Sequence, residues 1–303
     1  MDKRKNFTGE NIESKKSAFP VISGKNNEVI LHSPLLKERC RLTLIGDYHA
    51  TLEDERGKLF QQYSARMAQW GHSDMHHLEE LFSKGFQDGS DAIILLGDML
   101  SFPTEKGVET LAGMMKDSPI PILFTAGNHD WHYEGMPGSD MQKRQEWINK
   151  RLLPLYGGHD PMNYAVEIKG IKLLMVDNSV YQITPSQLAF CRKELSDGKP
   201  VLLVCHIPLF LGMPYHSVVN YGCGHPEWNG ANDPYFEIER RERWAQGGQS
   251  AETFAFCREI LESENVLGIA AGHTHTYCLE TFNNKFQLVV SSLSSTTLTL
   301  YGN

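Results

Sequence analysis

The sequence predicts an α/β fold, in which a β-sheet is covered by helices. Short apolar runs alternate along the 303 residues with longer stretches of helical periodicity, and such alternation is typical of α/β domains. Hydrophobic residues make up 41% of the chain and charged residues 22%, which is the composition of an ordinary soluble globular protein. No internal repeat or low-complexity linker divides the chain, so we expect one domain over residues 1–303.

Six apolar runs are predicted to form the central strands. They are RLTLIG (41–46), DAIILLG (91–97), IPILFTAG (120–127), KLLMVD (172–177), PVLLVC (200–205) and VLGIAAG (266–272). Helices are predicted over about 53–70, 74–87, 105–116, 139–153, 185–196 and 249–263. Thr184 before Pro185 is typical of a helix start, because threonine caps free backbone amides and proline fits the first turn. Ser250 is placed to cap the last helix.

Two antiparallel hairpins extend this otherwise parallel pattern. YAVEIKGIKLLMVD is predicted to turn at Lys169-Gly170 and YCLETFNNKFQLVV at Asn283-Asn284, because these residues tolerate positive φ. Residues 209–248 are instead rich in Gly, Pro, Asn and aromatics, with little periodicity. A structureless stretch of this length is usually functional, so we predict a long active-site loop or lid there. Residues 1–27 are predicted to form a polar N-terminal extension.

The charge balance argues against some classes of function. The net charge is −8 at pH 7, so the chain has no basic surplus for general nucleic-acid binding. No apolar run approaches the ~20 residues of a membrane span, and no membrane association is expected. The first twenty residues lack the apolar centre of a signal peptide, and the six cysteines include no C-x-x-C pair. These features favour a reducing, cytoplasmic location.

Polar side chains able to bind metal follow five of the predicted strands. The segments are GDYH (46–49), GD (97–98), GNHD (127–130), CH (205–206) and GHTH (272–275). In open α/β sheets, ligands bind beyond the carboxyl ends of the strands, so these groups should converge. Within GDYH and GHTH the two polar side chains are separated by one residue, which on extended backbone places both on the same face. The glycines allow a sharp turn and close approach at each corner.

Four imidazoles, two carboxylates and one amide oxygen make up the predicted donor set. They belong to Asp47, His49, Asp98, Asn128, His206, His273 and His275. This mixture suits divalent ions such as Mn, Fe, Zn, Co or Ni better than Ca or Mg. A single aspartate at a strand end is more often a polar cap. The ordered set of seven favours a metal site instead.

The ordered motifs GDxH, GD, GNHD, a lone His and GHxH resemble those of the calcineurin-like metallophosphoesterase superfamily, over residues 41 to 282. The resemblance implies two packed mixed β-sheets flanked by helices. It also implies two divalent metal ions: Asp47, His49 and His275 would hold the first, Asn128, His206 and His273 the second, and Asp98 would bridge both. A hydroxide bridging the two ions would then attack the phosphorus of a phosphoric ester.

Further residues are candidates for catalysis and substrate contact. The resemblance implies that His129 lies over the substrate and protonates the leaving oxygen, and that Asp130 orients its ring. Tyr215, His216 and His225, in the 209–248 loop, are candidates for substrate contact, although packing within the loop explains them equally well. His132 is either a wall of the pocket or a support for its neighbours.

The predicted function is metal-dependent hydrolysis of a small-molecule phosphate ester, either a phosphodiester or a phosphomonoester. Two alternatives stay open, a phosphoprotein phosphatase and a non-catalytic scaffold that keeps the fold. Against the first, GNHDWHYEG stands where that class has an arginine-bearing GNHE segment. Against the second, the ligand set is complete. The H-x-H-x-D-H string of metallo-β-lactamase-type hydrolases is absent. The sequence predicts no oligomeric state.

Overall fold

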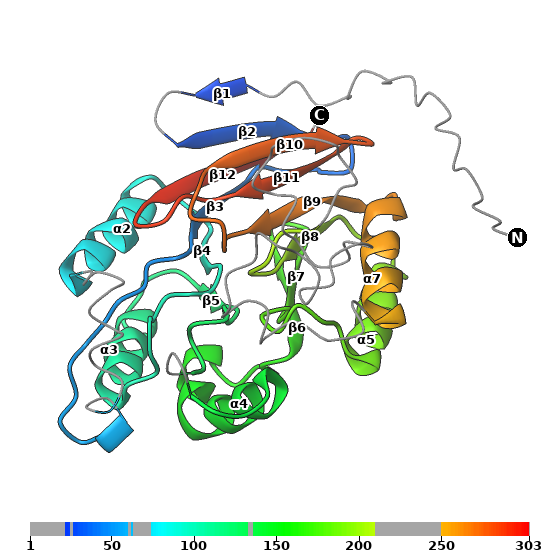
Figure 1. Ribbon diagram of the computed structural model, residues 1–303. Helices are drawn as coiled ribbons and strands as arrows, with labels where there is room; N and C mark the ends of the chain where they lie inside the picture. Colours follow the sequence, from blue (N-terminus) through cyan, green and yellow to red (C-terminus); the bar gives the residue numbers. More distant parts are fainter. Residues whose placement is uncertain are drawn as a thin grey trace, which may run out of the picture.

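The computed structural model describes residues 22–24, 27–59, 62, 74–132, 136–209 and 250–302. Their strands form two six-stranded sheets that pack against each other, with helices outside (Figure 1). Helices α2 (Met75–Gln87) and α3 (Glu105–Lys116) lie against the first sheet, on the left of Figure 1. Helices α5 (Pro185–Leu195) and α7 (Ala251–Glu262) cover the second sheet on the right. The predicted α/β sandwich is confirmed.

The first sheet has the strand order β1-β2-β12-β3-β4-β5. Its strands are β1 (Ile22–Gly24), β2 (Glu28–His32), β3 (Cys40–Ile45), β4 (Ala92–Leu95), β5 (Ile122–Phe124) and β12 (Ser295–Tyr301). β3, β4 and β5 are parallel, whereas β12 pairs antiparallel with β3, so the sheet is mixed. β4 is buried along its whole length, as expected for a parallel strand covered on both faces.

The second sheet has the strand order β10-β11-β9-β8-β7-β6. Its strands are β6 (Asn163–Ile168), β7 (Ile171–Val176), β8 (Val201–Val204), β9 (Val266–Ala271), β10 (Cys278–Phe282) and β11 (Lys285–Val289). β7, β8 and β9 are parallel, and the two outer pairs are the predicted hairpins. Both turns use positive φ, 49° and 71° at Lys169 and Gly170, and 44° and 60° at Asn283 and Asn284.

The predicted helix caps are confirmed, but one predicted helix changes its winding. The Thr184 hydroxyl accepts from the amide of Gln187, and the Ser250 hydroxyl accepts from the amide of Thr253. The segment predicted as a helix over 139–153 is α-helical only in α4 (Asp140–Trp147); it continues as the π-helix η1 (Ile148–Leu152) and the 3₁₀-helix η2 (Leu153–Tyr156). Pro154 explains the change, because its ring clashes with the carbonyl four residues earlier and has no N–H to donate.

The predicted helix over 53–70 is wrong at its start. Residues 51–54 have no regular structure, a turn follows at Glu55–Arg56, and helix begins only at residue 58. The carboxylate of Asp54 accepts from the amide of Arg56 at 3.1 Å and from that of Lys106 at 2.7 Å. Such a local bond to the amide two residues on favours a turn over a helix. Residues 60–61 and 63–70 of the prediction lie outside the described residues.

One hydrophobic core joins the two sheets. It contains Leu44 and Ile94 of the first sheet together with Leu173 and Leu202 of the second, all fully buried. Within the described residues, no helix combines the length and apolar character needed to cross a lipid bilayer. Because apolar side chains fill the interior, the polar loops lie at the edges of the sheets. The carboxyl ends of β3, β4, β5, β8 and β9 all lead to one such edge.

Candidate metal centre

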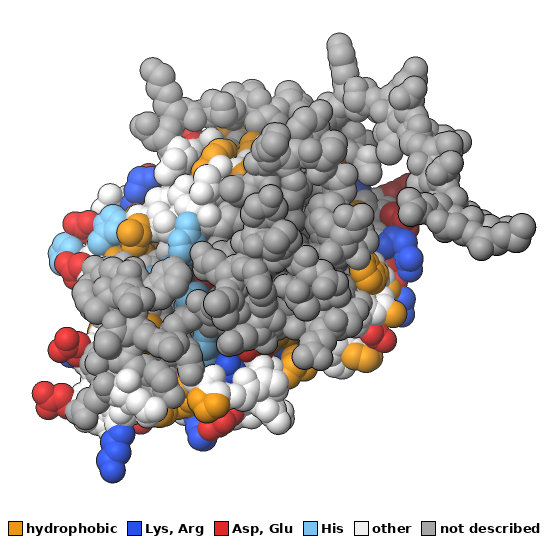
Figure 2. All heavy atoms as spheres, viewed as in Figure 1, with side chains coloured by type: hydrophobic (Ala, Val, Ile, Leu, Met, Phe, Trp, Pro, Cys, Tyr) orange, Lys and Arg blue, Asp and Glu red, His pale blue; other side chains and the backbone are white. Residues whose placement is uncertain are grey.

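Five loops meet at the carboxyl ends of the parallel strands and carry the seven predicted ligands. Backbone hydrogen bonds tie the loops to one another. The amide of Asp47 donates to the carbonyl of Gly97 at 3.0 Å, and the amide of Gly272 donates to the carbonyl of His206 at 2.9 Å. Histidine side chains gather on this face of the molecule (Figure 2). The structure thus brings together side chains more than two hundred residues apart in sequence.

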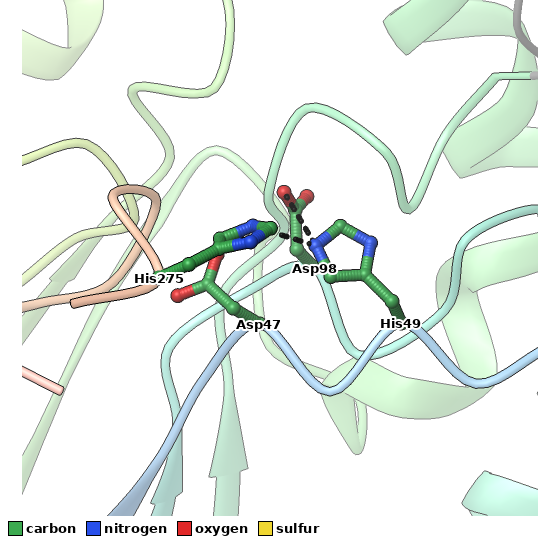
Figure 3. A group of neighbouring side chains, drawn as sticks. All are labelled: Asp47, His49, Asp98 and His275. Carbon is green, nitrogen blue, oxygen red and sulfur yellow. Dashed lines mark hydrogen bonds and ion pairs between the residues drawn. The ribbon is translucent and has the colours of Figure 1, made fainter. Parts of the chain in front are cut away.

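The first donor group consists of Asp47, His49, Asp98 and His275 (Figure 3). One ligand atom from each lies within 4.8 Å of the others. The Nε2 atoms of His49 and His275 are 3.0 Å apart, and Nε2 of His275 is 3.5 Å from Oδ1 of Asp47. The side chain of His275 is 41% exposed, whereas that of Asp47 is fully buried. The group is therefore open to solvent on the side of His275.

The second donor group contains Asp98, His206 and His273, again with one ligand atom each within 4.8 Å of the others. The amide oxygen of Asn128 joins it, 3.2 Å from Nε2 of His206 and 3.1 Å from Nδ1 of His273. Asp98 is common to both groups, as expected for a residue that bridges two ions.

The donor chemistry of the second group fits a cation. Nδ1 of His206 lies 2.8 Å from the carbonyl oxygen of Leu96, so this nitrogen carries the hydrogen. Its Nε2 faces two acceptors, Oδ1 of Asn128 and Oδ2 of Asp98, each at 3.2 Å. Against the effect of burial, the neighbouring charge of Asp98 raises the pKa of His206 to about 9, so in the metal-free protein a proton on Nε2 lies between these acceptors. A divalent ion bound by the same three atoms would take the place of that proton.

Strained backbone marks the same positions. Five of the seven predicted ligands adopt positive φ, between 51° and 74°: Asp47, His49, Asp98, His273 and His275. For residues other than glycine this left-handed conformation costs roughly 1–2 kcal/mol each. Strain of this kind persists where the surrounding structure over-determines it, and it clusters at functional sites.

Two glycines permit the close approach of the loops, as the sequence predicts. Gly97 has φ 86°, and a Cβ there would lie 2.7 Å from Nδ1 of His206. A Cβ on Gly127 would overlap the carboxylate of Asp98. Any larger residue at either position would push the loops after β4, β5 and β8 apart.

The buried charges of the centre shift one another's ionisation. Burial, together with the neighbouring charge of Asp98, raises the pKa of Asp47 to about 8. Burial alone would raise the pKa of Asp98 too, but the positive charge of His206 outweighs it and holds that pKa well below its usual range. Burial lowers the pKa of His49 to about 3. In the metal-free protein, a proton on Asp47 and the charge of His206 thus offset the two buried carboxylates, and bound cations would take over that role.

Comparison with known proteins identifies the family. The family model of the calcineurin-like phosphoesterases matches residues 40–277, which include all seven predicted ligands. The chain belongs to this family. The motifs that predicted the resemblance all lie within the matched segment.

The chain is also similar to two individual proteins. It is 24% identical over 185 residues to a "Probable cyclic nucleotide phosphodiesterase" of Fibrobacter succinogenes, a match that covers 60% of this chain and 63% of that protein. The match thus spans less than two thirds of the curated relative. The fold is similar to the crystal structure of a dimetal phosphatase from Danio rerio, with a TM-score of 0.52, 13% identity, and coverage of 89% of this chain and 93% of that one.

The structure places the carboxylate of Asp130 among backbone amides. Its Oδ2 accepts from the amides of Asp98 at 2.7 Å and Gly127 at 2.8 Å, and its Oδ1 accepts from that of Leu100 at 2.8 Å. Asp130 therefore holds the backbone of the loops after β4 and β5, and its role in orienting the ring of His129 stays a prediction.

His129 lies at the rim of the first donor group. Its ring meets that of His49 edge to face with centroids 5.0 Å apart, and its side chain is almost buried. The buried ring of His132 lies near those of His129 and Trp131, with centroids 5.8 and 4.8 Å away. Its burial favours a role as support for its neighbours over a role as a wall of the pocket.

Tyr215, His216 and His225, and the predicted lid over 209–248 apart from Leu209, lie outside the described residues. Leu209 itself is buried, and its amide donates to the side chain of Gln287 at 2.8 Å.

The sequence does not point to two residues that contact the ligands. Asn178 accepts from the amide of His206 at 3.2 Å, and the hydroxyl of Tyr181 lies 3.2 Å from Nε2 of His273. Both follow β7, and the aspartate that ends this strand run, Asp177, pairs with Arg144 and is not among the predicted ligands. Their position beyond the carboxyl end of a parallel strand was the one available signal.

Proposed function

We propose that this calcineurin-like phosphoesterase hydrolyses small phosphodiesters with the help of two divalent metal ions. The observation that carries the proposal is the pair of donor groups that share Asp98. The similarity to a probable cyclic nucleotide phosphodiesterase supports a diester, and it makes cyclic nucleotides the first substrates to test.

The residues divide into two ligand sets. Asp47, His49 and His275 would hold one ion and Asn128, His206 and His273 the other, with Asp98 between them. When bound, two divalent ions would neutralise negative charge on the phosphoryl group and activate water for attack on phosphorus. Transition metals that accept imidazole, such as Mn, Zn or Fe, suit this donor set.

The charge balance of the two ligand sets favours an anionic substrate. Asp47 and Asp98 are the only acids among the seven ligands. They offset two of the four positive charges that two divalent ions bring, and Asn128 adds no charge of its own. The surplus of positive charge attracts a phosphate ester and stabilises charge on its non-bridging oxygens.

His129 is the candidate general acid for this reaction. Its backbone amide donates to Oδ1 of Asp98 at 2.7 Å, which fixes the residue beside the acid shared by both donor groups. An imidazole there could give a proton to the departing oxygen. Such proton transfer typically contributes 10²–10⁴-fold to the rate.

A substrate comparison tests the proposal. Protein loaded with Mn²⁺ or Zn²⁺ is assayed with cyclic nucleotides, bis-p-nitrophenyl phosphate and p-nitrophenyl phosphate. We expect turnover of diesters above that of the monoester, loss of activity with EDTA, and recovery with metal. Asp98→Asn should be inactive, whereas Asp117→Asn, an exposed residue at the end of α3, should match the wild type. Activity that survives EDTA, or hydrolysis of the monoester alone, would refute the proposal.

A further inference from the structure

Tyr181 lies against His273, a predicted ligand of the second ion. Its hydroxyl is 3.2 Å from Nε2 of His273, and the two rings meet edge to face with centroids 5.6 Å apart. The other ring nitrogen, Nδ1, faces Oδ1 of Asn128 at 3.1 Å. For Nδ1 to offer a lone pair to a cation, Nε2 must carry the hydrogen and donate it to the tyrosine oxygen. Metal-bound histidines almost always donate their other N–H to a fixed acceptor in this way.

Asn178, three residues earlier, holds the backbone at His206. Its Oδ1 accepts from the amides of His206 and Ile207 at 3.2 and 3.0 Å, and its Nδ2 donates to the carbonyl of Ile207 at 2.7 Å. The side chain is fully buried. Asn178 thus fixes the path of the backbone at His206, just after the end of β8.

Ser179 connects the same loop to the segment that carries Asn128. The indole N–H of Trp131 donates to the hydroxyl of Ser179 at 2.9 Å. That hydroxyl donates in turn to Asp177, which is paired with the buried guanidinium of Arg144 on α4. The loop after β7 is therefore anchored to a helix on one side and to the segment carrying Asn128 on the other.

We propose that residues 177–181 are the positioning element of the second ion, with Tyr181 as the positioning residue for His273. This inference rests on the proposed two-ion site. The loop supplies no predicted ligand, yet its contacts reach the segments of Asn128, His206 and His273. Tyr181 has φ 62° and is only 4% exposed. A bulky residue is rarely held in this conformation, and such residues cluster at functional sites.

Titration of metal-free protein with Mn²⁺ tests the inference. Tyr181→Phe keeps the ring and removes only the hydroxyl. We expect the affinity for the second ion, measured by calorimetry, to fall roughly 10–100-fold, while that for the first changes little. The electron paramagnetic resonance signal of a coupled Mn²⁺ pair should weaken at two equivalents of metal. Ser179→Ala, which removes the anchor to Trp131, should weaken binding of the same ion to a lesser degree.

Tyr164→Phe is the matched control. The hydroxyl of Tyr164 is also buried, and it bonds to the amide and carbonyl of Phe124 at 3.1 and 2.9 Å. It should leave both metal affinities unchanged. Unaltered binding of the second ion by Tyr181→Phe, or equal weakening of both ions, would overturn the inference. A wild-type protein that binds two Mn²⁺ and hydrolyses no ester would refute the proposed function and leave the positioning role intact.

Discussion

Asp130 accepts a 2.7 Å hydrogen bond at Oδ2 from the backbone amide of Asp98, the acid common to both donor groups. Asp98 in turn accepts at Oδ1 from the backbone amide of His129, also at 2.7 Å. The loops after β4 and β5 are thereby locked together, and Oδ2 of Asp98 is left facing His206 at 3.2 Å. Asp130, the last residue of the GNHD motif, thus fixes the position of Asp98 in the loop after β4.

We predict that Asp130→Asn lowers both stability and metal content. The amide group replaces one acceptor oxygen with a donor, so at least one buried backbone N–H loses its partner. Leaving a buried donor unsatisfied costs about 1–3 kcal/mol, which thermal unfolding would detect. The exposed Asp117→Asn serves as the control. An unchanged melting temperature with a full complement of metal would show that this clamp is dispensable.

His129→Ala should slow esters with alkoxide leaving groups far more than p-nitrophenyl esters. A poor leaving group needs a proton in the transition state, and p-nitrophenolate does not. We expect a loss of about 10²–10⁴-fold in kcat for alkyl esters and a much smaller loss for aryl esters. His159→Ala, on an exposed side chain, should slow neither. Equal slowing of both ester classes would argue against a general-acid role.

Removal of metal should lower the melting temperature as well as abolish activity. Asp47 and Asp98 are both almost fully buried, and each ion that binds the folded protein stabilises it by mass action. At a free metal concentration of 100 times Kd the gain is about 2.7 kcal/mol for one site. Differential scanning fluorimetry with EDTA and then excess Mn²⁺ measures it. Asp98→Asn should lose most of the Mn²⁺-dependent increase, and a wild-type melting temperature indifferent to metal would contradict the two-site interpretation.

The ligand loops could be predicted from sequence because each directly follows an apolar strand. Asp47, Asp98 and His206 stand two or three residues after a strand end, and parallel strands bring their carboxyl ends to one edge. Tyr181 stands five residues beyond Val176, the last residue of β7, and only the turn of the loop directs it to His273. The bonds from Asp130 to the loops could not be predicted either, because its partners are backbone amides, which carry no sequence signal.

The outer strands of the first sheet show what periodicity can and cannot reveal. β12, with the sequence STTLTLY, alternates threonine and leucine and could have been recognised as a strand by its period of two. β1 has only three residues, too few for any period, and lies within the predicted N-terminal extension over 1–27. It is defined by its antiparallel pairing with β2, which involves Ile22, Ser23 and Gly24.

Asp54 is predicted to stabilise the fold in a pH-dependent manner. Its carboxylate bonds to the guanidinium of Arg56 and to the amide of Lys106 at the start of α3, and these contacts hold its pKa below the usual range. A lowered pKa in the folded state means that the stabilisation is fully present above the unfolded value of about 4 and is lost as the pH falls further. Asp54→Asn should therefore lower the free energy of unfolding by about 1–2 kcal/mol at pH 7, as measured by urea unfolding, and that difference should shrink progressively below pH 4.

Glu109→Gln is the control. The carboxylate of Glu109 also bonds to Arg56 but is exposed, so this change should have little effect at either pH. A deficit in Asp54→Asn that stays constant down to pH 2.5 would mean that packing, and not the charge, explains the loss.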